Sequence, residues 1–400
     1  MKIISIEPTP SPNSMKITMD HKLPNGIRKT YKSDNKNEAP IELQPLLDIP
    51  HVTSFYHASD FIALDRQPKG NWQQILTQVR ELFGDEKSEA KLFNQQAPDA
   101  ISGIQSTVTP DWGEVFVKIQ EFRGIPIQIR VTVGLEEQRI ALPERFAKAV
   151  MEAGMASPNL LRERKLVDQG VRYGEPQELL QVIVSELEAV YDDEKLASLV
   201  SQSLQLTQTT EDSSPNLNEQ LHLPLQATIK SQSLEQLTIS FQDEDWHKRY
   251  AALLQVRPDE KVIPLLVKAL SDPQASIRRI AAVYLGDTKG PLVLPHLFKA
   301  LKDTSSAVRR TVGDVLSDLG DPTAIEPMIE ALQDTNKLVR WRAARFLYEV
   351  GDQSAVPALE VAMDDPEFEV RMQVQIALER IKGGEAASGT IWQQMTQSNQ

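Results

Sequence analysis

Histidine and carboxylate side chains are the groups in this sequence best suited to bind a metal. The chain has six histidines and no cysteine, which excludes disulfides, cysteine nucleophiles, and zinc or iron–sulfur sites held by thiolates of this chain alone. His51, His57 and Asp60 lie close together in the sequence, and imidazole and carboxylate groups together can hold a metal ion. We treat these three residues as candidate metal ligands. The alternative is that they are surface or turn residues of a predicted β-hairpin.

The sequence contains none of the common catalytic or nucleotide-binding motifs. A P-loop, a dinucleotide fingerprint, the HExxH and GxSxG motifs and an EF-hand loop are all missing. The acidic runs at 192–194 and 364–365 are better explained as the beginnings of helices, where negative charge is favourable by about 0.3–1 kcal/mol. We therefore expect no catalytic residues and no cofactor held by this chain alone, with iron as the one alternative.

Length and composition limit what the elements that carry these residues can form. With 400 residues, 40% of them hydrophobic and 25% charged, the chain is long enough for two or three domains. It has 56 acidic and 43 basic residues and a net charge of −13, which disfavours binding of nucleic acid and of anionic membranes. No apolar run approaches the roughly 20 residues of a membrane-spanning helix, and the N-terminus lacks the pattern of a signal peptide. We expect a cytoplasmic protein whose partners are proteins.

A strict repeat occupies the C-terminal part of the chain. A Val-Arg or Ile-Arg pair recurs every 31 residues, with its arginines at positions 278, 309, 340 and 371. Aspartate and leucine positions recur with the same spacing. Each unit has the pattern of a short helix with proline in its first turn, a break and a second amphipathic helix. A helical hairpin of this kind must stack on its neighbours to bury its apolar face, so we predict a helical array over residues 241–382.

The repeats resemble HEAT-like repeats of the short type found in bilin lyases, in which an Asp precedes an Arg by six residues in every copy. The resemblance implies a structural ladder within and between hairpins, because a buried arginine is tolerated only when it is paired. The ladder residues are Asp272, Arg278, Asp303, Arg309, Asp334, Arg340, Asp365 and Arg371. Neighbouring arginines and large aromatic residues are better candidates for an interaction surface, although solvated charge and hairpin core are the alternative. These candidates are Arg279, Tyr284, Arg310, Trp341, Arg342, Arg345 and Tyr348.

The N-terminal segment EPTPSPNSMK has prolines at alternate positions, which favours an extended backbone that turns into the next strand. Together with the segment from 39 to 64, it resembles the N-terminal domain of Nfu/NifU iron–sulfur scaffold proteins. The residues that carry the resemblance include Glu7, Pro8, Pro10, Pro12, Asn13, Ser14, Lys16, Asp60, Phe61 and Ile62. The resemblance implies a domain over residues 1–84, closed by a helix from 72 to 83. Full-length Nfu scaffolds bind their cluster through a CxxC motif in another domain, and this chain lacks that motif.

Between these two regions, residues 85–200 contain alternating segments at 114–120 and 125–133 that predict a β-hairpin. Helices are expected near 143–153 and 177–189, so we predict a small α+β domain. Residues 201–240 are rich in Ser, Thr and Gln and predict a linker, and residues 383–400 predict a flexible tail. The order of these parts resembles the conserved virulence factor C family of bacteria. That resemblance implies the architecture and a loose connection to virulence regulation, but no reaction.

The sequence therefore predicts a multidomain protein with an α+β Nfu-like N-terminal domain, a small α+β middle region and a C-terminal all-α HEAT-like solenoid. We expect a non-catalytic scaffold that binds protein partners through the array, because stacked hairpins offer an extended surface. One alternative is an accessory factor in iron–sulfur cluster assembly, or an iron-binding protein, whose Nfu-like domain works with iron–sulfur assembly proteins. A second alternative, suggested by the repeat type, is a bilin-type prosthetic-group lyase.

Overall fold

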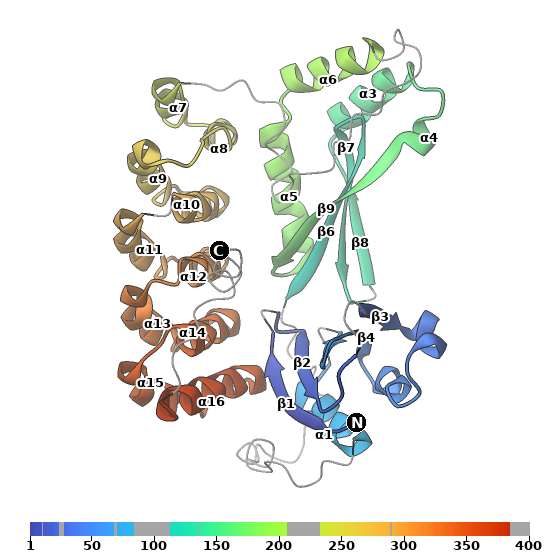
Figure 1. Ribbon diagram of the computed structural model, residues 1–400. Coiled ribbons are helices and arrows are strands. Elements are labelled where there is room, and N and C mark those ends of the chain that lie inside the picture. Colours follow the sequence, from blue (N-terminus) through green and yellow to red (C-terminus); the bar gives the residue numbers. More distant parts are fainter. Residues whose placement is uncertain are drawn as a thin grey trace, which may run out of the picture. The chain divides into compact units, whose positions relative to one another are not determined.

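The structure is a computed structural model in which residues 1–9, 11–23, 28–67, 70–83, 113–134, 136–205, 233–288 and 290–384 are described. By its internal contacts the chain divides into two compact units. Unit 1 comprises residues 1–112 and 316–400, and unit 2 comprises residues 113–315. The division falls inside a repeat helix, so each unit contains both a β-sheet and part of the helical array (Figure 1).

Unit 1 begins with a five-stranded antiparallel sheet in the order β1-β2-β5-β4-β3. Its strands are β1 (Ile3–Pro8), β2 (Ser14–Met19), β3 (Arg28–Lys32), β4 (Val52–Ala58) and β5 (Phe61–Arg66). Alternate residues of β2 and β5 are buried, as expected for a sheet with one face on the core. That core is completed by helix α1 (Trp72–Leu82) and the 3₁₀ turn η2 (Gln44–Asp48), while η1 (Ser33–Glu38) follows β3.

The proline-rich N-terminal segment is bound by two side chains from the other end of this domain. Arg66 donates from Nε to Oδ1 of Asn13 at 3.2 Å and from Nη2 to the carbonyl of Pro12 at 3.3 Å. The indole Nε1 of Trp72 donates to the same carbonyl at 2.8 Å. The Arg66 guanidinium also lies 4.9 Å from the centre of the Trp72 ring. Pro12 and Asn13 therefore have a structural role, because they hold a buried arginine in place.

Arg66 also connects the sheet to the last repeat helix, α16 (Phe368–Lys382). Its Nη2 lies 2.7 Å from Oε1 of Glu369, and the two side chains are only 1% and 8% exposed. Met372, at the next turn of α16, belongs to the same apolar core as Phe55 of the sheet. Within unit 1, the Nfu-like domain and the last hairpin thus share one core.

The repeats of unit 1 form two helical hairpins from α13 to α16. The first three helices are α13 (Ile325–Ala331), α14 (Lys337–Glu349) and α15 (Val356–Ala362). Arg340 binds Asp365 of the next hairpin, with 2.6 Å between Nε and Oδ2, and donates to the carbonyl of Asp334 at 2.9 Å. Arg371 donates to the carbonyls of Asp365 and Pro366. Carboxylate contacts therefore run between hairpins, and carbonyl contacts run within them.

Unit 2 contains a four-stranded antiparallel sheet in the order β8-β7-β6-β9. Its strands are β6 (Glu114–Phe122), β7 (Ile125–Val133), β8 (Glu136–Ala141) and β9 (Arg164–Tyr173). The predicted hairpin is formed by β6 and β7, and Arg123 and Gly124 turn the chain with positive φ angles. The helices of this region are α3 (Glu144–Gly154), α4 (Leu160–Glu163), α5 (Pro176–Val190) and α6 (Asp193–Gln205).

Strand β9 contains a bulge that changes the face to which its last residues point. Two of its residues, Gln169 and Gly170, lie opposite the single residue Val117 of β6. Gly170 has a φ of 75°, in the left-handed region that favours glycine. Gln169 and Arg172 consequently line the same small pocket, although side chains three residues apart in a regular strand point to opposite faces.

Helix α5 lies between the sheet and the repeats within unit 2, where it packs on β7 and on the repeat helix α8 (Figure 1). Leu180, Ile183, Leu187 and Val190 of α5 are buried. The helix is therefore covered on more than one side, and it joins the middle sheet to the array. Among the described residues, no helix combines the length and apolar character needed to cross a bilayer.

The repeats of unit 2 follow the plan of those in unit 1. Their helices are α7 (Leu234–Ser240), α8 (Trp246–Leu253), α9 (Ile263–Ala269), α10 (Ala275–Asp287), α11 (Leu294–Ala300) and α12 (Ser306–Leu319), of which the last four residues belong to unit 1. Arg278 binds Asp303 of the next hairpin, with 2.7 Å between Nε and Oδ2, and donates to the carbonyl of Asp272 at 2.8 Å. Arg309 donates to the carbonyl of Asp303 at 2.8 Å. Both arginines thus fix the break between the two helices of their own hairpin.

The first repeat of the array lies within the predicted range of 241–382, but its spacing differs from the 31 residues of the other repeats. Arg249 binds Asp272 at 2.7 Å and donates to the carbonyl of Asp243, as Arg278 does one hairpin later. Arg249 lies 29 residues before Arg278, so the first repeat of the array is two residues shorter than the other repeats.

The segment predicted to be a linker, residues 201–240, is helical at both ends. Helix α6 continues to Gln205, and α7 begins with a capping box formed by Ser233 and Gln236 and buries Leu237. The capping residues are polar, which is why composition alone assigned them to the linker. Residues 84–112, the centre of the predicted linker at 206–232 and residues 385–400 of the predicted tail lie outside the described residues.

Replacing Arg278 with alanine removes one contact of the ladder and leaves the Asp303 carboxylate without its cation. We expect the free energy of unfolding at pH 7 to fall by about 2 kcal/mol. Burial raises the pKa of Asp303, but Arg278 and the N–H of Ser305 outweigh it and hold that pKa below its ordinary value. The contribution is therefore present above the unfolded pKa of about 3.9 and is lost as the pH falls through the folded value.

Urea unfolding of the full chain should accordingly show a smaller difference between wild type and Arg278→Ala at pH 3 than at pH 7. Arg257→Ala, at an exposed arginine of the same unit, is the matched control and should change stability by no more than about 0.5 kcal/mol. Equal losses in the two variants at pH 7 would contradict the ladder.

Replacing Arg66 with methionine leaves Glu369 buried without its cation. We expect this variant to lose about 3–5 kcal/mol of unfolding free energy, because an unpaired buried charge is strongly unfavourable. The double variant Arg66→Met/Glu369→Leu should recover part of the loss, and denaturant unfolding in a double-mutant cycle measures the coupling. Additive losses in the double variant would show that the two residues do not stabilise the unit as a pair.

Candidate functional site

A cavity of about 360 Å³ lies within unit 2. Strand β9 and helix α5 form one part of its wall, and the first turns of α10 and α12 form another. Its volume falls in the range of ligand-binding pockets. The lining combines the charged side chains of Arg172, Glu186, Arg279 and Arg310 with serine hydroxyls and short apolar side chains.

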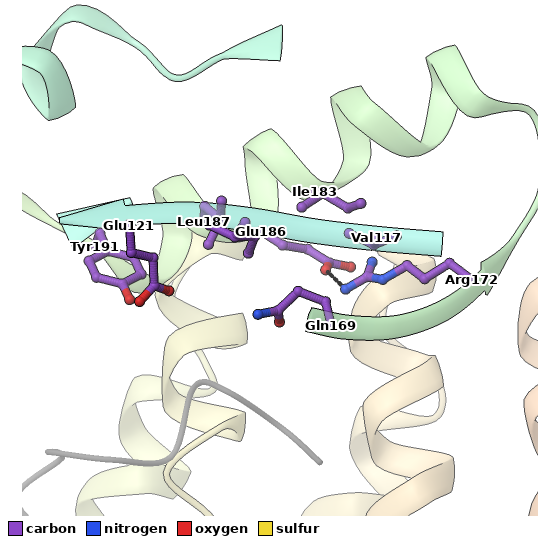
Figure 2. Close-up of a pocket in the computed structure, with 9 residues that line it drawn as sticks. Val117, Glu121, Gln169, Arg172, Ile183, Glu186, Leu187 and Tyr191 are labelled. Atoms are coloured by element: carbon purple, nitrogen blue, oxygen red, sulfur yellow. Dashed lines mark ion pairs between the residues drawn. The ribbon is translucent and has the colours of Figure 1, made fainter. Parts of the chain in front are cut away.

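A buried ion pair between Arg172 and Glu186 forms part of this wall. Nη2 of Arg172 lies 2.7 Å from Oε2 of Glu186, whose side chain is 3% exposed, and Figure 2 shows the two side chains pointing at each other from β9 and α5. Burial alone would raise the pKa of Glu186, but Arg172 and Arg279 hold it below its ordinary value. Burial alone would lower the pKa of Arg172, but Glu186 raises it above its ordinary value. Both side chains therefore stay charged near neutral pH.

Helix α10 directs a hydroxyl and a second arginine at the same carboxylate. Ser276 donates from Oγ to Oε1 of Glu186 at 2.8 Å. Nη2 of Arg279 lies 3.8 Å from the same oxygen, and within the described residues this is the one ion pair that Arg279 makes. Burial, followed by the positive charge of Arg172, lowers the pKa of Arg279. Arg279 thus lies close to the positive charge of Arg172, and the carboxylate of Glu186 is 3.8 Å away from it.

Helix α12 supplies the third arginine of the cavity. Nη2 of Arg310 lies 3.0 Å from Oδ2 of Asp314, one turn later in the helix. The guanidinium carbon lies 3.4 Å from the centre of the Tyr173 ring. Tyr173 in turn donates its hydroxyl to Oε1 of Glu114 at 2.7 Å, and burial raises the pKa of Tyr173 above its usual value. Pairing and stacking together hold Arg310 at the cavity.

The beginnings of three helices also contribute to the cavity. Helix α5 begins at Pro176, α10 at Ala275 and α12 at Ser306, and residues of each first turn lie in the lining. Among the described residues, no side chain caps the start of α5 or of α10. The first N–H groups of a helix have no partner within it and carry partial positive charge. Backbone donors therefore add to the positive character that the arginines supply.

A second, much smaller pocket shares Arg172 and Glu186 with the cavity (Figure 2). Its volume of about 20 Å³ leaves room for a single water molecule. Glu121 and Tyr191 lie together at one end, and burial raises the pKa of both. The pocket is too small for a ligand, so we regard it as part of the core between the sheet and α5.

The residues predicted to form an interaction surface differ in location and exposure in the structure. Arg279 and Arg310 line the cavity. Tyr284 and Trp341 are 1% and 2% exposed, and Arg345 is buried in an ion pair with Glu349. The prediction of an interaction surface is therefore wrong for Tyr284, Trp341 and Arg345, because these side chains fill the hairpin cores. Arg342 and Tyr348 are partly exposed.

The candidate metal ligands do not come together. His51 and His57 flank most of strand β4, so they lie roughly 20 Å apart at about 3.3 Å per residue. His51 is exposed, whereas His57 is 2% exposed and has its pKa lowered by burial. Asp60 lies in the exposed turn that follows β4. A single site formed by all three is excluded, and in the described part of the chain no group of three His, Cys, Asp or Glu residues could hold a metal ion.

Two residues of the cavity, Arg172 and Glu186, were missed by the sequence analysis. Glu186 lies beside Ile183 and Leu187 among the buried residues of α5. A carboxylate in the middle of such a buried set indicates a buried partner, and this signal was available. Arg172 has no comparable signal, because the bulge at Gly170 interrupts the alternation from which its direction would be predicted.

Three protein-family models match different parts of the chain and together cover most of it. A family model described as "Scaffold protein Nfu/NifU N terminal" matches residues 4–90, and one described as "Virulence factor" matches residues 120–200. A third, described as "HEAT repeats", matches residues 231–313 and 294–379. The resemblances to the Nfu/NifU N-terminal domain and to HEAT repeats are confirmed, as is the fold class of a sheet-rich N-terminal region followed by helical repeats.

Relatives match the chain over nearly its whole length. The protein YpgR of Bacillus subtilis strain 168 is 50% identical over 398 residues, which are 100% of this chain and 99% of the relative. Conserved virulence factor C of Staphylococcus aureus strain MRSA252 is 42% identical over 397 residues, or 99% of each chain. A crystal structure of protein SAV1430 from Staphylococcus aureus, 37% identical, covers 21% of this chain and 99% of its own with a TM-score of 0.20. Because the full-length relatives match from end to end, the chain belongs to the conserved virulence factor C family.

Proposed function

We propose that this protein is a non-catalytic scaffold that binds a protein partner at the cavity of unit 2. The observation that carries the proposal is the origin of the cavity wall, which comes from the HEAT-type helices α10 and α12 and from β9 and α5 of the middle region. Stacked helical hairpins commonly present binding surfaces. Arginine and tyrosine, which line this cavity, are enriched among the residues that contribute most to binding. A partner that enters the cavity contacts both parts of unit 2.

The charged groups of the cavity suit recognition better than acid–base chemistry. Arg172 and Glu186 hold each other in their charged forms, and the hydroxyl of Tyr173 is bound to Glu114 with its pKa raised. A general acid or base works best when its pKa lies near the operating pH. These groups are shifted away from that range, which supports a binding role.

A photo-crosslinking amino acid at Val182 tests the proposal in the cells that produce the protein. Val182 lies in the cavity lining and is 40% exposed, so a bound partner comes within crosslinking reach. We expect one discrete crosslinked protein, identified by mass spectrometry, which also crosslinks at Val182 when purified and mixed with the full chain.

The same amino acid at Arg139, an exposed position on β8, is the matched control and should give no such product. The absence of any crosslinked protein at Val182, or equal yields at the two positions, would count against a partner site at the cavity.

The match of residues 4–90 to Nfu/NifU N-terminal segments supports a second candidate function. In this candidate, the N-terminal domain associates with iron–sulfur assembly proteins that carry the cluster on their own cysteines. The chain has no cysteine, so the thiolates that usually hold such clusters have to come from the partner.

Anaerobic purification with iron analysis tests this second candidate. We expect iron to co-elute with the full chain only after it is mixed with a cysteine-bearing cluster scaffold protein. The full chain mixed with the same scaffold protein without its cluster is the control and should elute without iron. No association of the full chain with the loaded scaffold protein would reject this function.

A further inference from the structure

The cavity of unit 2 also indicates the chemical group that it binds. We propose that it recognises one carboxylate carried by a peptide of the partner, with Arg279 as the main contact. This inference rests on the scaffold function proposed above and names the group that such a partner presents. It follows from the charge, the donors and the volume of the cavity.

Arg279 has the weakest pairing of the cations at this wall. Arg172 lies 2.7 Å from Glu186 and Arg310 lies 3.0 Å from Asp314, whereas Arg279 lies 3.8 Å from Glu186, which it shares with Arg172. A guanidinium offers two parallel N–H groups to a carboxylate. A carboxylate ligand is therefore suited to the N–H groups of Arg279 that Glu186 does not occupy.

Hydrogen-bond donors of the backbone lie on the same wall. Ala275 and Ser276 at the start of α10, and Ser306 and Ala307 at the start of α12, belong to the cavity lining together with Arg279. Helix beginnings favour negative charge. Here they supplement a guanidinium that has spare donors, so side-chain and backbone donors favour the same kind of ligand.

Exposed acids of the lining disfavour extended polyanions. Glu175 and Glu178 line the cavity and are exposed, so the lining carries three acidic and three basic side chains. A nucleic acid that extends past the three arginines meets these acids, and like charges repel in proportion to their product. The net charge of −13 for the whole chain acts in the same direction.

The volume and the apolar residues of the cavity indicate that the carboxylate is attached to a larger molecule. The cavity measures about 360 Å³, and Val171, Leu179 and Val182 contribute apolar surface to it. An isolated carboxylate would leave this surface uncovered, whereas a short stretch of peptide covers it. The carboxylate can come from the C-terminus of the peptide or from an Asp or Glu side chain, and both present the same chemistry to Arg279.

Selection of binding peptides by the full chain tests the inference. The ligands are random heptapeptides displayed with free C-termini, and the selected sequences are resynthesised for calorimetry. We expect amidation of the C-terminus, or replacement of an internal acid by its amide, to weaken binding at least tenfold, which corresponds to about 1.4 kcal/mol. The first change identifies a terminal carboxylate and the second identifies a side chain.

The variant Arg279→Gln should lose at least tenfold in affinity for the same peptides, and Arg279→Lys should lose less because it keeps the charge. Glu186 keeps Arg172 and Ser276 in both variants, and thermal unfolding checks that they fold. Arg139→Gln makes the same charge change at an exposed site of the same unit and should bind within twofold of wild type.

Failure to select any peptide, full binding by Arg279→Gln, or indifference to both changes of the peptide carboxyl groups would each overturn the inference. The two proposals fail separately. Peptides that bind Arg279→Gln as tightly as wild type, together with a partner crosslink at Val182, would leave the scaffold function standing and remove the carboxylate site. Carboxylate-dependent peptide binding without any crosslinked partner would support the carboxylate site and count against the scaffold function.

Discussion

An arginine that is removed from water needs a carboxylate or carbonyl partner, because an unpaired buried charge is strongly unfavourable. This requirement governs several parts of the molecule. In the repeats, Arg278 and Arg340 each bind an aspartate of the following hairpin and a carbonyl of their own. At the end of the array, Arg66 brings the N-terminal sheet onto α16 through Glu369. In unit 2, the same need joins β9 to α5 through Arg172 and Glu186.

The features that the sequence predicted correctly are local and repeated. The helical hairpins follow from apolar periodicity within short segments, and the β6–β7 hairpin follows from alternation on both sides of Arg123 and Gly124. The first repeat of the array departs from the 31-residue spacing because it is two residues shorter. Its Asp243 and Arg249 nevertheless lie six residues apart, as in every other copy. The spacing within a hairpin is therefore a better guide to the array than the spacing between hairpins.

The features that the sequence could not predict depend on contacts between distant segments. Nothing near Arg66 in the sequence indicates Glu369 of α16, and nothing near Arg172 indicates Glu186. Composition was also misleading for Tyr284 and Trp341, since large aromatic residues serve interfaces and cores equally well, and here they fill cores. The sequence predicted no cavity. Of the cavity residues it named only Arg279 and Arg310, as candidates for an interaction surface, because the other wall depends on how β9 and α5 pack in unit 2.

The bulge at Gln169 and Gly170 makes the cavity sensitive to the length of strand β9. Arg172 reaches Glu186 because one additional residue precedes it opposite Val117. Deleting that one residue would reverse the orientation of Arg172 and separate Glu186 from its nearest cation, although every residue of the cavity would still be present. Among relatives, the number of residues in this strand is therefore a better marker of an intact cavity than the presence of the arginine itself.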